Sequence, residues 1–112
     1  MNYRNRDLLD LAYLLPCTLR LPGCIGGVSV PCHSNQSAHG KGMSIKAHDN
    51  FYAAGCANCH HEIDFGCKLS REERESAWAR GHYETCLTLW KMEAICVNPQ
   101  FARSTGMWEC AA

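Results

Sequence analysis

Two stretches of the chain carry apolar residues at helical spacing. The first runs from Asn5 to Leu15, and Pro16 ends it. The second follows Ser70-Arg71-Glu72-Glu73, which matches a capping box, where a serine hydroxyl and a glutamate satisfy the first backbone N–H groups of a helix. A partly apolar face continues from there to Trp90. The pattern therefore predicts an N-terminal helix and a longer helix from Ser70 to about Trp90.

Short alternating segments lie between the two predicted helices. The stretch Cys17–Cys24 predicts a short strand and a tight turn, and Val28–Val30 alternates as a short strand does. We expect these two segments to pair as a hairpin that ends at Cys32 and His33. The polar, glycine-bearing stretch 34–48 indicates an exposed loop, and a short helix is expected from Cys59 onward. The expected fold class is therefore a small α+β domain.

The size of the chain and its cysteine content limit what can stabilise this domain. The chain has 112 residues and nine cysteines, an odd number that cannot pair completely within one chain. No apolar stretch approaches the ~18 residues of a membrane helix, and the N-terminus lacks the uninterrupted apolar region of a secretory signal. We expect a cytoplasmic protein without membrane association, where paired cysteines more often indicate a metal than a disulfide. The domain is expected to span residues 1–91, and the tail 92–112 shows no assignable pattern.

Charge is unevenly distributed although the formal net charge is zero. No Asp or Glu occurs between Leu11 and His48. That stretch carries these basic residues and histidines: Arg20, His33, His39, Lys41, Lys46 and His48. An acid-free segment that carries cations is what a nucleic-acid phosphate backbone would attract. The alternative is chance clustering of a few charges.

The Gly40–Lys46 stretch lies within this acid-free half. Glycines let backbone N–H groups approach phosphate, and Lys41 and Lys46 add positive charge. The spacing is not that of a Walker loop. We expect Lys41 and Lys46 to contact a DNA backbone; a mobile, solvated loop is the alternative.

The most informative motif is Cys56-Ala57-Asn58-Cys59-His60. A C-x-x-C-H sequence is typical either of a zinc site or of c-type haem attachment. Haem attachment requires export and would leave the Cys17 and Cys24 pair unexplained. Zinc in a structural site prefers four soft ligands from two short-spaced pairs. We therefore expect a structural zinc on Cys17, Cys24, Cys56 and Cys59; the alternative is that Cys17 and Cys24 are small buried apolar residues.

The histidines suggest a reaction. Asp64 follows His60 by four residues, so both side chains should share one face of a helix. An imidazole and a carboxylate at this spacing can hold a divalent cation with open positions for phosphate and water. His33 could then take a proton from the attacking water, because an imidazole titrates near neutral pH. These are the parts needed for metal-assisted phosphodiester hydrolysis, although each histidine alone could be an ordinary surface residue.

The order of these motifs carries a family resemblance. The motifs are Cys17–Cys24, Cys32-His33-Ser34-Asn35, Gly40–Asp49 and Cys56–His60. Together they resemble the small prophage-borne YbcO-type predicted nucleases, which belong to the HNH, or His-Me finger, group. The resemblance covers about residues 4–91 and does not include the tail.

This resemblance implies a zinc-braced ββα-metal finger with flanking helices that acts on DNA in phage or prophage biology, inside a bacterial host cell. It places the general base on His33 and a catalytic cation, Mg²⁺ or another divalent ion, on His60. Two departures stand out: Cys32 occupies a position where HNH enzymes usually carry an Asp or His ligand, and Asn50 lies one residue further from Cys56 than is usual.

The expected function is a divalent-metal-dependent endonuclease. The alternative is a non-catalytic zinc module that binds DNA or a phage recombination or replication protein.

Overall fold

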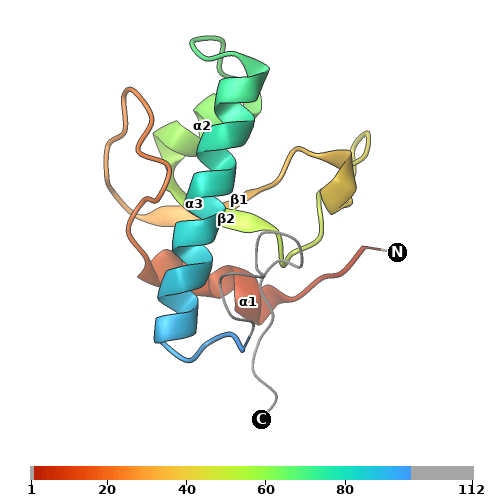
Figure 1. Ribbon diagram of the computed structural model, residues 1–112, viewed down its shortest axis with the longest axis vertical. Helices are drawn as coiled ribbons and strands as arrows, with labels where there is room; N and C mark the ends of the chain where they lie inside the picture. The colour runs from red at the N-terminus through yellow and green to blue at the C-terminus, as the bar shows by residue number, and fades with distance from the viewer. Residues whose placement is uncertain (1, 97–112) are drawn as a thin grey trace.

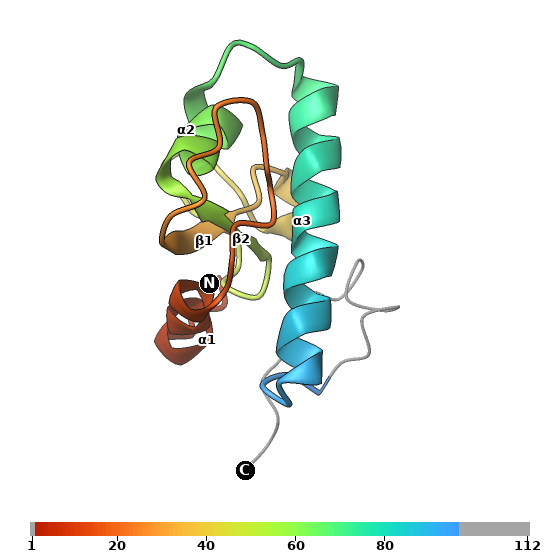
Figure 2. The ribbon, with the colours of Figure 1, turned by 90° about the vertical axis from the view of Figure 1, so that its left-hand side faces the viewer.

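The structure is a computed structural model, which describes residues 2–96. It is a small α+β fold in which one long helix lies beside a two-stranded sheet and two shorter helices (Figure 1). The elements, in chain order, are α1 (Arg6–Asp10), η1 (Leu11–Leu14), β1 (Ser29–His33), η2 (Ser37–His39), β2 (Tyr52–Cys56), α2 (Ala57–Phe65) and α3 (Arg71–Lys91). Figure 2 shows α3 along one side of the molecule, with α1, the sheet and α2 on the other. Trp108–Cys110 and the rest of the tail beyond residue 96 lie outside the described residues.

The sheet is not the predicted hairpin. Strand β1 pairs antiparallel with β2, so that Ser29 lies opposite Cys56 and His33 opposite Tyr52. The stretch 17–24 forms no strand, and the prediction that it pairs with Val28–Val30 is wrong. Strand β2 escaped prediction because all five of its residues are buried, so its sequence Tyr-Ala-Ala-Gly-Cys shows no alternation of apolar and polar residues.

The helices follow the predictions more closely. Helix α1 begins after Asn5, whose side chain accepts a hydrogen bond from the Leu8 N–H at 3.1 Å, and it continues as the 3-10 turn η1. Helix α3 has the predicted capping box: Ser70 Oγ accepts from the Glu73 N–H at 3.1 Å, and the Glu73 carboxylate accepts from the Ser70 N–H at 2.9 Å. Helix α2 begins two residues earlier than expected, with Cys56 as its N-cap.

A leucine from the irregular 17–24 stretch fills the space between the sheet and α3. Leu19 is fully buried, and a Cβ atom on Gly81 would lie 2.8 Å from Leu19 Cδ2. A Cβ atom on Gly55 would lie 2.7 Å from Leu19 Cδ1. These two glycines therefore give the strand β2 and the helix α3 the close approach that Leu19 needs.

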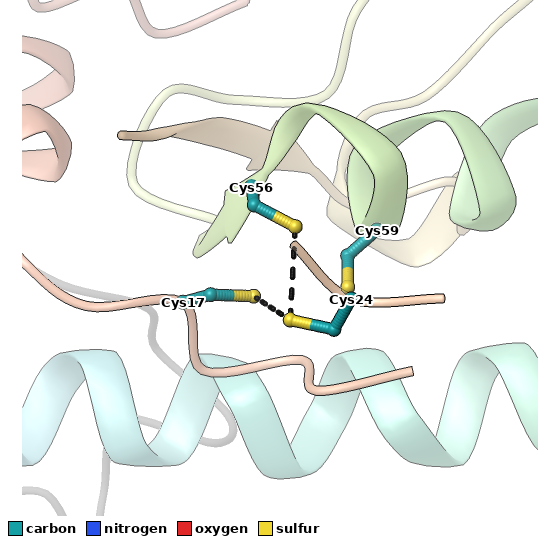
Figure 3. A group of neighbouring side chains, drawn as sticks. All are labelled: Cys17, Cys24, Cys56 and Cys59. Carbon is teal, nitrogen blue, oxygen red and sulfur yellow. Dashed lines mark hydrogen bonds between the residues drawn. The ribbon is translucent and has the colours of Figure 1, made fainter. Parts of the chain in front are cut away.

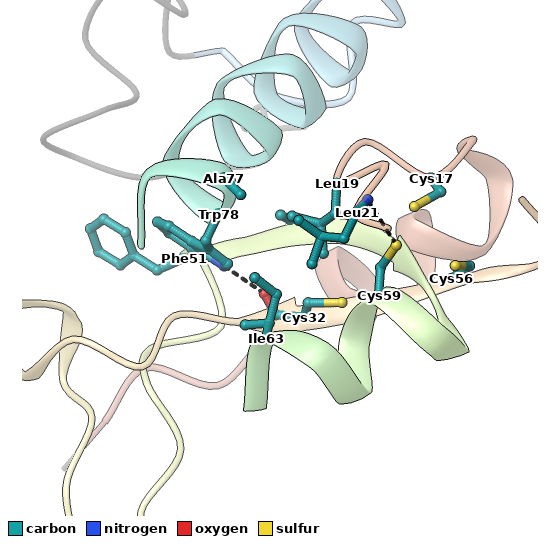
Figure 4. Packing of buried hydrophobic residues seen from close by; sticks show 11 residues of the cluster. Cys17, Leu19, Leu21, Cys32, Phe51, Cys56, Cys59, Ile63, Ala77 and Trp78 are labelled. Atoms are coloured by element: carbon teal, nitrogen blue, oxygen red, sulfur yellow. Dashed lines mark hydrogen bonds between the residues drawn. The ribbon is translucent and has the colours of Figure 1, made fainter. Parts of the chain in front are cut away.

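The core between α2 and α3 is closed by an aromatic residue. Trp78 of α3 is almost fully buried, and its indole N–H donates to the backbone oxygen of Cys32 at 2.9 Å (Figure 4). Leu21, Cys32 and Ile63 fill the space between the two helices. This packing fixes α2 against the end of β1. Among residues 2–96, no helix has the length and apolar character needed to cross a membrane.

Candidate functional site

Four cysteine sulfurs meet where the 17–24 stretch crosses the start of α2 (Figure 3). The ligand atoms of Cys17, Cys24, Cys56 and Cys59 all lie within 4.8 Å of one another. The Cys24 sulfur is 3.7 Å from the Cys17 sulfur and 3.7 Å from the Cys56 sulfur. Four sulfurs bound tetrahedrally at ~2.3 Å from zinc would be about 3.8 Å apart. The cluster therefore has the dimensions to hold a metal ion such as zinc.

The environment of this cluster favours a thiolate at Cys56, the N-cap of α2. Burial alone would raise the pKa of Cys56, but hydrogen bonds from the backbone N–H groups of Cys59, Ile25 and Gly26 outweigh it and lower the pKa to about 6. Burial raises the pKa of Cys59 well above its ordinary value, although the Leu21 N–H points to its sulfur at 3.4 Å. A cation bound here would displace the remaining protons and make all four sulfurs thiolate ligands.

His33 ends β1 and is oriented by a buried carboxylate. Its Nε2 lies 2.9 Å from Asp49 Oδ1, and the Asp49 side chain is only 4% exposed. Asp49 is itself held by the Asn5 N–H at 2.7 Å and by Arg4 Nη1 at 3.3 Å. A carboxylate accepts from Nε2–H, so a neutral His33 keeps its lone pair on Nδ1.

The lowered pKa of His33 is compatible with a role as a general base. Burial lowers the pKa of its imidazole below the ordinary value, and the hydrogen bond to Asp49 offsets only part of this effect. His33 is therefore neutral at pH 7 and free to accept a proton.

His60 and Asp64 lie together on the exposed face of α2, as their spacing predicts. His60 Nε2 is 3.1 Å from Asp64 Oδ2, and the two side chains are 39% and 26% exposed. Asn35 Nδ2 donates to the other carboxylate oxygen, Oδ1, at 2.9 Å. Burial alone would raise the pKa of Asp64, but the hydrogen bonds from His60 and Asn35 outweigh it and lower the pKa. The Asp64 carboxylate is thus ionised. Asn35 fixes its Oδ1, and its Oδ2 lies beside the His60 imidazole.

Lys41 and Lys46 flank a tight turn. Gly42 and Ile45 exchange two backbone hydrogen bonds, each 3.1 Å long, which closes the loop between the two lysines. The N-terminal segment anchors this loop, because Asn2 Nδ2 donates to the Lys46 backbone oxygen at 2.8 Å and Arg4 Nη1 to the Ala47 oxygen at 2.6 Å. The stretch 34–48 was expected to be an exposed loop. It is exposed only in part, because Ser34 and Ala47, near its two ends, are buried.

One open cavity of about 460 Å³ brings these groups together. All the residues predicted for catalysis, catalytic metal binding and phosphate contact line it: His33, Lys41, Lys46, His60 and Asp64. The cysteine cluster lies on the other face of α2, where Cys59 is fully buried next to the half-exposed His60. Helix α2 thus carries a sulfur cluster and an open cavity on different faces.

Two residues that position side chains of the cavity were not assigned a role by the sequence. Asp49 orients His33 from sixteen positions away, and no spacing rule connects a strand end to a loop residue at that distance. Asn35 holds Asp64 from across the cavity. Its place two residues after His33, inside the motif that carries the resemblance, was the available signal. Cys32, which stands where HNH enzymes usually carry a metal ligand, is fully buried and belongs to the core cluster.

The fold is shared with a solved structure. No family model and no curated protein matches the chain. The structure of a "putative bacteriophage protein" from Escherichia coli str. K-12 substr. MG1655 superposes with a TM-score of 0.58 and 24% sequence identity, covering 76% of this chain and 98% of that one. At this identity the match shows a common fold and nothing more about activity.

Proposed function

We propose that the protein is a divalent-metal-dependent endonuclease of the HNH type that hydrolyses DNA phosphodiester bonds in phage or prophage DNA recombination or processing. The observation that carries the proposal is the cavity in which a carboxylate-oriented imidazole, His33, shares walls with the His60–Asp64 pair and two lysines. Structural similarity to a bacteriophage protein supports the phage context.

The order of elements supports the family resemblance. Strands β1 and β2 are followed directly by α2, with the base candidate at the end of β1 and the ligand candidates on α2. This is the arrangement expected of a ββα-metal finger. In the proposal, the cysteine cluster holds a structural zinc that fixes the irregular 17–24 stretch to the N-terminus of α2.

In this proposal each group of the cavity has its own role in hydrolysis. His33 Nδ1 takes the proton of the attacking water while the water oxygen bonds to phosphorus and the bond from phosphorus to the leaving oxygen breaks. A divalent cation on His60 and Asp64 would stabilise the charge that develops on the phosphate and the leaving oxygen. Lys41 and Lys46 hold the backbone on either side of the turn, and Asp49 keeps His33 in the tautomer that leaves Nδ1 free.

The rival function is a zinc module that binds DNA or a phage recombination or replication protein without cleaving. Cys32 favours it, because it stands where HNH enzymes usually place a metal ligand, and its sulfur is buried in the core. Against it, Asp64 supplies a carboxylate to the same cavity from α2.

The test is cleavage of supercoiled plasmid and of branched DNA with Mg²⁺ or Mn²⁺. Wild type, His33→Ala and His61→Ala would be purified identically; His61 is an exposed neighbour of His60 that does not line the cavity. Loss of a general base should lower the rate by about 10²- to 10⁴-fold in His33→Ala, with DNA affinity kept, and leave His61→Ala unchanged. Equal activity in all three would indicate a contaminant or another base. DNA binding without cleavage in the wild type would favour the rival function.

A further inference from the structure

A second cavity shares a wall with the first. It measures about 210 Å³ and lies between α2 and the beginning of α3. Asn35 and Asp64 line both cavities, whereas Arg71, Arg74 and Glu75 of α3 line only the second. None of the functions discussed above uses these two arginines.

Arg74 has unused hydrogen-bonding capacity. Its Nη1 donates to the Gly66 backbone oxygen at 3.3 Å, while its Nε is buried without a partner among the described residues. A buried guanidinium N–H that has lost water and gained no acceptor costs ~1–3 kcal/mol. The Nε and Nη2 groups form the edge of the guanidinium that binds phosphate or carboxylate in a bidentate manner. An anion bound in the second cavity, which Arg74 lines, would supply the acceptor that this edge lacks.

The charges around the second cavity depend on the first. Arg71 and Arg74 face two carboxylates, Asp64 and Glu75, and Arg71 Nε already pairs with Glu75 at 3.2 Å. Without a cation the four charges cancel. A divalent cation on Asp64 would leave the cavity net positive, so anion binding there should strengthen when the cation is present.

The aromatic wall of the second cavity favours a phosphate over a base. Base stacking requires an open aromatic face. Trp78 is only 4% exposed, and its ring is stacked on His82 with a centroid distance of 4.8 Å and an interplanar angle of 9°. Its indole N–H is also taken by the Cys32 backbone oxygen. The donor groups left to meet an anionic ligand are the two guanidinium groups and the Gln36 carboxamide, because Asn35 Nδ2 already donates to Asp64 Oδ1 and to the Ile63 backbone oxygen.

We propose that the second cavity is a subsite for a DNA backbone phosphate flanking the phosphodiester held in the first cavity, with Arg71 and Arg74 as its cationic contacts. The proposal rests on the proposed function, since it takes DNA to be the molecule in the first cavity. Successive phosphates of one strand are separated by a single sugar, so two cavities that share Asn35 and Asp64 as wall residues are close enough to hold phosphates of neighbouring nucleotides. Lys41 and Lys46 then contact the strand on one side of Asp64, and the two arginines on the other.

The experiment measures the affinity of a short fluorescent DNA duplex by anisotropy over a series of salt concentrations, with and without Ca²⁺. The variants are Arg71→Gln, Arg74→Gln and Arg74→Lys, with Arg80→Gln as the matched control. Arg80 lies on the same helix but lines neither cavity, since its guanidinium donates to the Leu19 backbone oxygen. Arg71 is 77% exposed, so Arg71→Gln tests the subsite even if Arg74→Gln disturbs folding, which thermal melting would reveal.

Each glutamine substitution should lower the affinity about 5- to 10-fold and reduce the slope of log K against log[salt] by about 1, because one phosphate contact is lost. Arg74→Lys should keep the slope and lose part of the affinity, because lysine cannot bind in a bidentate manner. The loss should be larger with Ca²⁺ than without it. Arg80→Gln should retain the wild-type slope.

The outcomes separate this inference from the proposed function. Wild-type cleavage with unchanged slopes in Arg71→Gln and Arg74→Gln would overturn the subsite and leave the endonuclease standing. Slopes reduced in these two variants, in a wild-type protein that binds but never cleaves DNA, would establish the subsite and overturn the endonuclease. A wild-type protein that binds no DNA would overturn both.

Discussion

The cysteine cluster and the first cavity, which His33 and His60 line, both draw residues from helix α2. They differ as a closed metal site differs from an open one. The cluster offers four sulfurs and no other donor, and three of its cysteines are buried. The cavity offers an imidazole and a carboxylate that are 39% and 26% exposed, beside a volume of about 460 Å³. A structural zinc fills its coordination with protein ligands, whereas a catalytic ion keeps positions for water and substrate. Changes in the cluster should therefore act on stability, and changes in the cavity on activity.

The largest expected effect is the removal of one sulfur ligand. Cys59→Ser should lose the metal and unfold the domain at 37 °C, because structural zinc contributes apparent binding free energies on the order of 10 kcal/mol to small domains. Metal content by mass spectrometry and thermal unfolding by circular dichroism would measure this. A chelator should do the same to the wild type.

Cys67→Ser is the matched control, since Cys67 is an exposed thiol outside the cluster. It should retain the metal and the wild-type melting temperature. If Cys59→Ser melted like Cys67→Ser, the cluster would be a group of buried thiols and its contrast with the cavity would disappear.

The next largest effect concerns the carboxylate that orients His33 in the cavity. Asp49→Asn should lower cleavage by up to about 10⁴-fold, because asparagine no longer fixes the His33 tautomer that leaves Nδ1 free. It should also cost ~1–3 kcal/mol of stability, because Asp49 accepts from the Asn5 N–H and Arg4. Asp7→Asn, on the exposed side of α1, is the control.

The pH dependence of cleavage gives this variant a second readout. Burial keeps the pKa of His33 below its ordinary value of 6.5, so wild-type cleavage should be constant from pH 7 upward and fall only as His33 becomes protonated at lower pH. Because Asp49 raises the His33 pKa, its replacement by asparagine should move the acid limb further down the pH scale. An acid limb that stayed in place would show that another group is the base.

The sequence predicted what depends on local order and missed what depends on tertiary contacts. The capping box of Ser70 and Glu73 and the pairing of His60 with Asp64 are set within four residues, and both are present. The hairpin partner of β1 was wrong because Tyr52–Cys56 is buried on both faces and carries no alternation. The stretch 17–24 reads as a strand by its own residues, but in the fold Leu19 inserts between β2 and α3 instead.

The candidate site divides in the same way. The four cysteines were grouped by their spacing, and their sulfurs lie within 4.8 Å. Asp49 could not be assigned, since its contact with His33 exists only because the loop 34–51 folds back over the end of β1. Arg71 and Arg74 were assigned no role from the sequence, and only the packing of α3 against α2 gives them a common cavity.

The smallest expected effect strains the stretch that carries Cys17 and leaves the cavity unchanged. A Cβ atom on Gly81 would lie 2.8 Å from Leu19 Cδ2 and 2.9 Å from Thr18 Oγ1, in the stretch that carries Cys17. Leu19 cannot swing away because it is fully buried, and Thr18 Oγ1 is held by the Ala54 oxygen at 2.7 Å. Overpacking costs ~1–3 kcal/mol, whereas alanine gains about 1 kcal/mol over glycine in a helix. Gly81→Ala should therefore lose about 1 kcal/mol by denaturant unfolding.

Gly27→Ala is the control for this substitution, because a Cβ atom there would meet nothing within 4 Å. Gly81→Ala should retain its metal and cleave within about twofold of the wild type, since the strain falls on Thr18 and Leu19, outside the cavity. A gain in stability would mean that α3 lies farther from Leu19 than the structure shows. A large loss of cleavage with little loss of stability would mean that the two sides of α2 are coupled, and the separation between a closed structural site and an open reactive one would not hold.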